Sequence, residues 1–145
     1  MPNGLALSQK SLYKSWPEHS FQRKINFLIH KKRNLKAALD ILETEMRENL
    51  VKPQQAHYRI LIHACAKVGH TKKAFQLFTS FRKRQLKKHV GIYTDLFLSC
   101  SLSEDKIYAL EQAHWLRKKL AEDHFIPNKI LYHSMIQASF VKNAI

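Results

Sequence analysis

The sequence contains few residues of several kinds, and each shortage excludes a class of protein. Only 3 glycines and 4 prolines occur among 145 residues, which argues against a turn-rich all-β fold and against a glycine-rich phosphate loop. The 2 cysteines, Cys65 and Cys100, are too few for a disulfide framework and fit a reducing compartment. No apolar run approaches the roughly 20 residues that a membrane-spanning helix needs. We therefore expect no membrane insertion.

Acidic residues are scarce as well. The chain carries 11 Asp and Glu against 25 Lys and Arg, which gives a formal net charge of +14. Hydrophobic residues make up 45% of the chain, which is enough for a packed core. A folded protein with this excess of positive charge is expected to bind a polyanion, and nucleic acid is the commonest one.

The first residues have a composition of their own. The first 17 contain no Asp or Glu and carry Lys10, Lys14 and three serines. This weakly resembles an organellar transit peptide. We therefore assign residues 1–20 to an N-terminal tail that precedes the first apolar stripe.

The strongest internal signal is a phrase that recurs every 35 to 39 residues. Tyr58-Arg-Ile-Leu-Ile returns as Tyr93-Thr-Asp-Leu-Phe and again as Tyr132-His-Ser-Met-Ile. A second phrase, Ala74-Phe-Gln-Leu, returns as Ala113-His-Trp-Leu. A fixed period in this range is typical of a helical solenoid.

Each unit is predicted to contain two antiparallel helices. Gly69 separates two apolar stripes with the i, i+3, i+4, i+7 spacing of one helix face, and Thr71 is a candidate N-cap of the second helix. The first stripe contains Tyr58, Leu61, Ile62 and Cys65, and the second contains Ala74, Leu77, Phe78 and Phe81. Because neither helix can bury its stripe alone, stacking on neighbouring units supplies the core.

The whole chain is predicted to be all-α, a right-handed α-solenoid of stacked antiparallel helix hairpins with about seven helices. The units cover about residues 21–54, 55–89 and 90–128, with a partial unit at 129–145. Asn34 is a possible cap in the first unit. The third unit has four extra residues around 101–109, between its helices, where Ser101 and Glu104 have capping-box spacing. We expect the partial unit to leave a hydrophobic face uncovered, as in a segment of a longer array.

These features resemble the pentatricopeptide repeat family between residues 21 and 140. The resemblance is carried by the prolines that close the flanking units and by three phrases: Tyr58-x-x-Leu-Ile, Ala64-x-Ala-Lys-x-Gly and Ala74-x-x-Leu-Phe. Tetratricopeptide repeats have a similar period but require a Trp-x-x-Leu-Gly start, which is absent here.

The resemblance implies binding of single-stranded RNA in the mitochondrial matrix, along the concave face formed by the first helices, at about one base per repeat. It implies a role in transfer RNA processing or ribosomal RNA maturation. The chain departs from the family pattern by one extra residue between Ala38 and Met46 and by the insertion in the third unit. Its second unit also ends at Lys88-His89 without the Pro or Asp of the family pattern.

The family's base-reading positions correspond to named residues here. In the third unit they are Thr94 and Asn128, a pair that the family uses for adenine, with Ile130 as a flanking residue. Arg59 with His89 matches no common pair, and His133 lacks its partner. A Thr hydroxyl and an Asn amide can both meet the Watson–Crick edge of a purine. Alternatively, Thr94 is an ordinary exposed helix residue and Asn128 a turn residue.

Two lysines are candidates for phosphate contacts. Lys67 lies near the end of a predicted first helix, and Lys31 belongs to the cluster Lys31-Lys32-Arg33. Other basic clusters, such as Arg82-Lys83-Arg84 and Arg117-Lys118-Lys119, lie on second helices, whose outer faces point away from RNA in this family. The repeated tyrosines share a stripe with core residues, so we expect them to pack between helices rather than stack on bases.

Nothing in the sequence predicts an enzyme, a metal site or a cofactor. Three of the 9 histidines, His57, His63 and His70, lie near Cys65, but without the spacing of tetrahedral zinc sites. No deaminase motif, aspartate cluster, nucleophile elbow or P-loop occurs. The alternative to RNA binding is a helical scaffold for other proteins in a mitochondrial RNA or ribosome complex.

Overall fold

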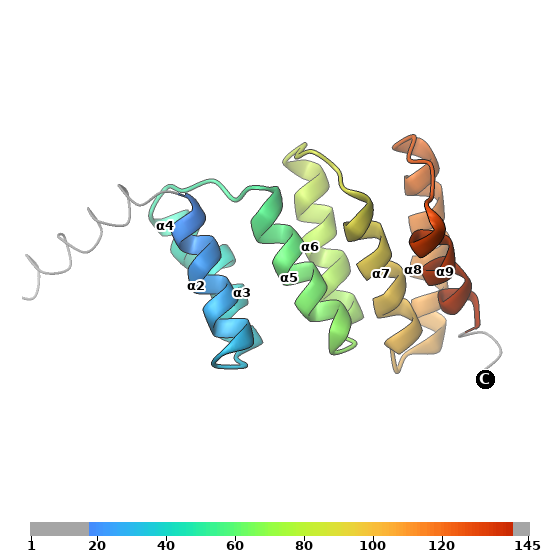
Figure 1. Ribbon diagram of the computed structural model, residues 1–145, viewed down its shortest axis with the longest axis horizontal. Coiled ribbons are helices and arrows are strands. Elements are labelled where there is room, and N and C mark those ends of the chain that lie inside the picture. The colour runs from blue at the N-terminus through green and yellow to red at the C-terminus, as the bar shows by residue number, and fades with distance from the viewer. Residues whose placement is uncertain (1–17, 141–145) are drawn as a thin grey trace, which may run out of the picture. The chain divides into compact units, whose positions relative to one another are not determined.

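A computed structural model describes residues 18–140, and the chain is entirely helical there, without a strand (Figure 1). The possible transit segment lies outside the described residues. Seven continuous helices are present in the described part, which confirms the predicted all-α class. Their bounds are α2 Glu18–His30; α3 Leu35–Asp40, continued by the π-helix η1 Ile41–Glu45 and by α4 Met46–Glu48; α5 Gln55–Lys67; α6 Thr71–Lys83; α7 Val90–Leu102; α8 Lys106–Glu122; and α9 Lys129–Phe140.

The chain divides into two compact units, Met1–Ile60 and Leu61–Ile145, and α5 contains the division. In the first unit α2 packs against α3. Phe21 and Ile25 of α2 are fully buried. Asn34 caps α3 as predicted, because its Oδ1 accepts a hydrogen bond from the Ala37 N–H at 3.0 Å.

The extra residue between Ala38 and Met46 is accommodated by a π-helical turn. The Met46 N–H donates to the Ile41 carbonyl, five residues earlier instead of four. A π turn takes up one additional residue without breaking the helix. Ala38 and Met46 therefore lie on the same side of the helix, and both are fully buried.

In the second unit α7 packs against α6, α8 and α9. Both predicted stripes around Gly69 are buried, as their spacing predicted. Gly69 has a φ of +75° and lies so close to α7 that a Cβ there would be 3.1 Å from the Leu102 carbonyl oxygen. The helix break that Gly69 predicted is therefore confirmed.

The predicted capping role of Thr71 is wrong. The N-cap of α6 is His70, and its side chain makes no capping bond. Thr71 is instead the first helical residue and is buried, and its hydroxyl donates to the Ser99 carbonyl of α7 at 2.8 Å. A hydrogen bond to a neighbouring helix, which sequence spacing cannot reveal, takes the place of the local cap.

The expected place of the four extra residues is also wrong. The connections 68–70 and 103–105 are equally long, whereas α8 has 17 residues and α6 has 13. The insertion therefore lengthens α8 by about one turn, which leaves the orientation of its apolar face nearly unchanged. Ser101 lies inside α7, and Asp105 caps α8 by accepting from the Tyr108 N–H at 3.0 Å.

The repeat period returns in the backbone at the ends of the second helices. Leu50, Gln85 and His124, which follow α4, α6 and α8, have φ values of +58°, +55° and +58°. They are separated by the same 35 and 39 residues as the repeated tyrosines. Left-handed residues commonly end helices, usually as glycine. Here none of the three left-handed residues is glycine, so the sequence gives no sign of these helix ends.

The expectation that all three repeated tyrosines are buried is wrong for one of them. Tyr58 and Tyr93 are 1% and 0% exposed, whereas Tyr132 is 54% exposed. Tyr132 lies on α9, which packs on α7 and α8 with one side only. The uncovered apolar face expected of a partial unit is confirmed in the described residues, because Ile130 and Ile136 are also more than half exposed.

Candidate nucleic-acid interface

The predicted base-reading residue Thr94 lies on α7 and is half-buried. Its hydroxyl donates to the Val90 carbonyl at 3.1 Å, one turn earlier. The hydroxyl oxygen still has lone pairs with which it can accept a hydrogen bond. Thr94 can therefore act toward a base as an acceptor.

Asn128, the predicted partner of Thr94, is exposed and caps α9. Its Oδ1 accepts from the Leu131 N–H at 2.8 Å. The cap uses the amide oxygen, and the amide NH₂ keeps two donors. Ile130, the predicted flanking residue, is 67% exposed in the first turn of α9. The cap fixes the orientation of the amide without using its donors, and base reading by Asn128 stays a prediction.

His89 has a capping role at the start of α7. Its Nδ1 accepts from the Gly91 N–H at 2.9 Å, so this nitrogen carries no proton in the capping geometry. A Cβ at position 91 would lie 3.0 Å from that nitrogen. Glycine at 91 therefore leaves room for the capping imidazole.

The remaining candidates are exposed helix residues or helix-end residues. Lys67 is the last residue of α5, and His133 lies on α9, which packs on the helix that carries Thr94. Lys31, which follows α2, and Arg59 on α5 belong to the first unit and are exposed as well. Exposure leaves all four side chains accessible to a ligand.

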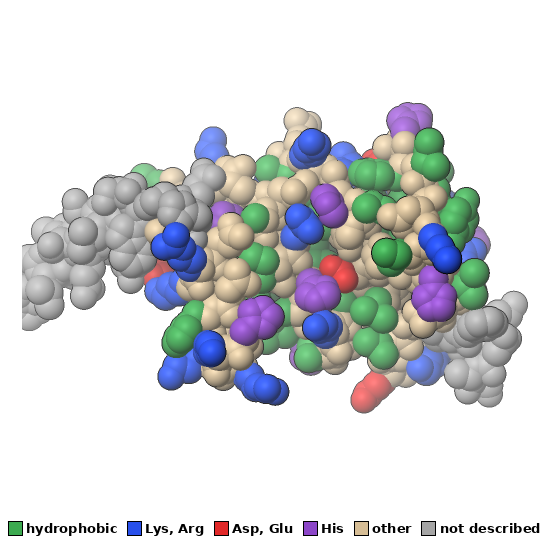
Figure 2. All heavy atoms as spheres, viewed as in Figure 1, with side chains coloured by type: hydrophobic (Ala, Val, Ile, Leu, Met, Phe, Trp, Pro, Cys, Tyr) green, Lys and Arg blue, Asp and Glu red, His purple; other side chains and the backbone are tan. Residues whose placement is uncertain are grey.

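Sequence reasoning missed a polar pair that joins two first helices of the second unit. Nδ1 of His63 on α5 lies 2.9 Å from Oδ1 of Asp95 on α7, and the two side chains are 48% and 18% exposed. Several separate histidine side chains are visible on the face that shows α5, α7 and α9 (Figure 2). The sequence offered one weak clue to this pair. Asp95 directly follows the predicted reading position Thr94, and His63 lies one helical turn after the predicted reading position Arg59.

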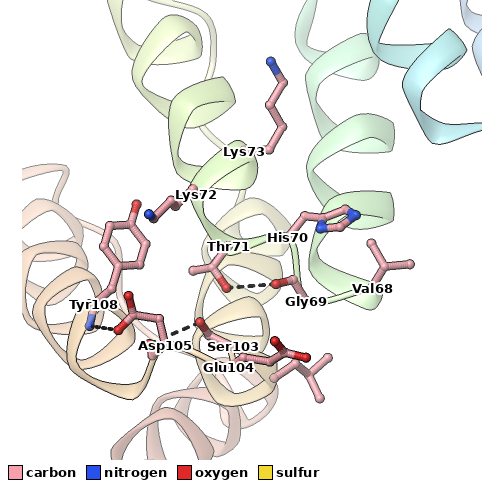
Figure 3. Close-up of a pocket in the computed structure, with 11 residues that line it drawn as sticks. Val68, Gly69, His70, Thr71, Lys72, Lys73, Ser103, Glu104, Asp105 and Tyr108 are labelled. Carbon is pink, nitrogen blue, oxygen red and sulfur yellow. Dashed lines mark hydrogen bonds between the residues drawn. The ribbon is translucent and has the colours of Figure 1, made fainter.

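A pocket of about 470 Å³ lies beside the connections 68–70 and 103–105 (Figure 3). Lys72 and Lys73 line it together with Glu104 and Asp105, so the charges around it are mixed. The Lys72 ammonium lies 5.5 Å from the centre of the Tyr108 ring, a cation–π contact. Burial, the largest cause, raises the pKa of the Tyr108 hydroxyl. This balance of charge argues against a dedicated anion site.

Metal binding has no support in the described part of the chain, which contains no group of three His, Cys, Asp or Glu side chains placed to hold an ion. Cys65 and Cys100 form no disulfide and are fully buried. Burial raises the pKa of the Cys100 thiol to about 12, so this side chain is a neutral core residue. Among residues 18–140, no helix has the length and apolar character to cross a membrane.

The positive charge of the second unit lies mainly outside its first helices. Between residues 61 and 140, only Lys67 and Lys129 among the lysines and arginines belong to α5, α7 or α9. The others lie on α6 and α8 or in the segment after α6; they are Lys72, Lys73, Arg82, Lys83, Arg84, Lys87, Lys88, Lys106, Arg117, Lys118 and Lys119. No Asp or Glu occurs between Glu48 and Asp95.

Comparison with known proteins gives a consistent result. No protein-family model matches the chain. The chain is 37% identical over 110 residues to the pentatricopeptide repeat-containing protein 1, mitochondrial, of Rattus norvegicus and of Mus musculus, and 37% identical over 108 residues to that of Homo sapiens. These matches cover 74–75% of this chain but only 15–16% of each relative, so the chain spans a small part of their length. The repeated sequence phrases, the all-helical fold of the described residues and this identity together identify the chain as a relative of pentatricopeptide repeat proteins.

Proposed function

We propose that this chain is a single-stranded RNA-binding segment that acts in the mitochondrial matrix, in transfer RNA processing or ribosomal RNA maturation. The similarity to mitochondrial pentatricopeptide repeat proteins over three quarters of the chain carries the proposal. The net charge of +14 supports it, because neutralising phosphates releases counterions from RNA. The chain acts as a binding module and not as an enzyme.

In this proposal the units at about 21–54, 55–89, 90–128 and 129–145 stack as a right-handed solenoid. RNA lies along the first helices, where Thr94 and Asn128 of the third unit receive one base and Ile130 of the partial unit flanks it. Arg59, His89 and His133 occupy the equivalent reading positions of the other units, and Lys67 and Lys31 contact phosphates.

Fluorescence anisotropy with an unstructured 20-nucleotide RNA tests the RNA-binding function. Titrations between 50 and 400 mM KCl should show affinity that falls steeply with salt, because phosphate contacts release counterions. An oligonucleotide of uncharged morpholino units with the same sequence is the control and should not bind. Absence of RNA binding at 50 mM KCl would refute the proposal for this chain.

The base assignment has its own test, in which Asn128→Asp is compared with Asn128→Ser. Both replacements keep an oxygen that can cap α9, so the helix should be retained. Aspartate replaces the donating amide NH₂ by a carboxylate oxygen that can only accept. The base preference of the protein should therefore shift from adenine toward guanine in a binding competition. Serine should only weaken the adenine preference. Identical base profiles for the parent and both variants would eliminate the Thr94 and Asn128 assignment.

A protein scaffold is the second candidate function, and the exposed apolar side chains on α9 favour it. Ile130, Tyr132 and Ile136 are 67%, 54% and 52% exposed, a pattern typical of protein contact surfaces. Ile136→Lys distinguishes the two functions. Lost association with protein but unchanged RNA affinity would favour the scaffold.

Localisation is tested with the endogenous protein. Protease treatment of intact mitochondria, of mitoplasts and of detergent-lysed mitoplasts should digest the protein only after lysis. Digestion in mitoplasts would place it outside the matrix.

A further inference from the structure

A groove lies between α6 and α8 in the second unit, on helices that are not expected to read bases. Its lining consists of Thr79, Arg82 and Lys83 from α6 and Trp115 and Lys119 from α8, around a volume of about 310 Å³. We call these five residues the α6–α8 groove. Three of them are cationic, and no carboxylate is among them.

The three cations of the groove differ in how firmly they are held. Arg82 donates to the buried Asp123 carboxylate at 2.8 Å and is fixed in place. Lys119 pairs at 3.0 Å with Glu122, whose side chain is 57% exposed. Lys83 is exposed and forms no ion pair with a described residue. A phosphate can therefore approach Lys83 directly and compete with Glu122 for Lys119.

Trp115 forms the apolar wall of the groove. Its ring contacts Phe75 and Phe78 edge-on at centroid distances of 6.2 and 6.1 Å, which holds it against the core. The Lys119 ammonium lies 5.6 Å from its ring centre. Its indole N–H makes no hydrogen bond to a described residue, so it can donate to a ligand in the groove.

The surroundings of the groove favour RNA over a protein partner. No large hydrophobic side chain of α6 is exposed, and on α8 only Ile107, in the first turn, is. A protein interface would be expected to have an apolar centre. Beyond Lys83 the chain continues with Arg84, Lys87 and Lys88 and without an acidic residue, which suits an extended chain of phosphates.

We infer that the α6–α8 groove binds the sugar–phosphate backbone of RNA and forms a second contact surface, separate from the first helices that would receive bases. This inference rests on the proposed RNA-binding function. It assigns most of the electrostatic affinity to the second helices, where most of the cations of this unit lie. The groove supplies affinity without base choice, because phosphates are the same in every sequence.

Two charge-matched double variants test the inference in the RNA titrations described above. Lys83→Gln with Lys119→Gln removes two groove cations, and Lys67→Gln with Lys129→Gln removes the two first-helix cations of the same unit. The slope of log K against log salt is negative, and the groove variant should reduce its magnitude by about 1.4. This value corresponds to two lost single-strand phosphate contacts at about 0.7 each. The first-helix variant should reduce the magnitude of the slope by about half as much, because only Lys67 of that pair is proposed to contact a phosphate. Equal slopes for the two variants, or a smaller loss for the groove variant, would overturn the inference.

Trp115 provides an independent measurement, because the chain has only 2 tryptophans. In a Trp16→Phe background the remaining emission comes from Trp115, and saturating RNA should change it. The change should disappear in the groove variant. Unchanged Trp115 emission while RNA is bound would place the RNA elsewhere and refute the groove.

Two further outcomes separate this inference from its alternatives. If the parent chain binds no RNA at 50 mM KCl, both the proposed function and the groove fail. If the groove variant binds RNA like the parent but loses binding to poly-L-glutamate, the groove recognises an acidic protein segment, and the RNA assignment is overturned. Circular dichroism of each variant shows whether the helices are retained.

Discussion

Asp123 accepts hydrogen bonds from both Arg82 and Tyr93 and thereby ties three helices of the second unit together. The Arg82 guanidinium donates to Oδ2 of Asp123 at 2.8 Å, and the Tyr93 hydroxyl donates to the same oxygen. The Asp123 side chain is only 7% exposed. Burial, followed by the Asp123 carboxylate, raises the pKa of the Tyr93 hydroxyl, so tyrosine stays a neutral donor.

We predict that Asp123→Ala lowers the free energy of unfolding by about 2 to 3 kcal/mol, because it leaves a partly buried arginine and a buried hydroxyl without their acceptor. Its neighbour Glu122 provides the control. Glu122→Ala breaks an exposed ion pair with Lys119 and should cost less than about 0.5 kcal/mol. Urea denaturation followed by circular dichroism measures both. Equal losses would show that Asp123 contributes no more than a surface charge.

The π-helical turn predicts unusual tolerance of a deletion. Removing the exposed Thr44 should convert η1 to regular α-helix and leave Ala38 and Met46 on the same face, with a change in unfolding free energy of about 1 kcal/mol or less. Removing the exposed Gln76 from α6 rotates all later residues of that helix by about 100° and should abolish cooperative unfolding. Thermal melting compares the two deletions, and a Thr44 deletion as damaging as that of Gln76 would contradict the argument.

Replacement of glutamine by glycine should stabilise the chain at a left-handed helix end and destabilise it inside a helix. Gln85 has a φ of +55°, so Gln85→Gly should stabilise the chain by about 0.5 to 1 kcal/mol through relief of backbone strain. Gln76 lies inside α6, where Gln76→Gly should destabilise by a similar amount. Denaturant midpoints measured on both variants give the sign directly. A destabilised Gln85→Gly would show that the Gln85 side chain makes a contact worth more than the strain.

The buried Cys100 thiol predicts sensitivity to alkali. Its pKa is raised by burial from 9.0 to about 12, so the folded state prefers the neutral thiol. The resulting stability is fully present below pH 9 and is lost as pH rises from 9 toward 12, at about 1.4 kcal/mol per pH unit. Chemical denaturation at successive pH values measures this slope, and Cys100→Ala should be less stable but should have a shallower slope. An unaltered slope would exclude Cys100 as its source.

The sequence by itself determined the elements whose signals are local. Stripes at i, i+3, i+4 and i+7 placed the helices, since one face of a helix must be apolar to be buried. Gly69 marked a helix end because glycine adopts a positive φ, here +75°, more easily than any other residue. Asn34 marked a cap because a short side chain can bond the backbone two or three residues ahead.

Only the tertiary structure decided features that depend on a second segment of the chain. Thr71 is of a residue type that often caps helices, but its hydroxyl donates to the Ser99 carbonyl of α7. The extra residues of the third unit lengthen α8, because a whole added turn preserves its apolar face. His63 meets Asp95 across 32 positions, and the α6–α8 groove exists only because two second helices lie side by side. Such contacts are set by packing between elements, whose energies no local spacing encodes.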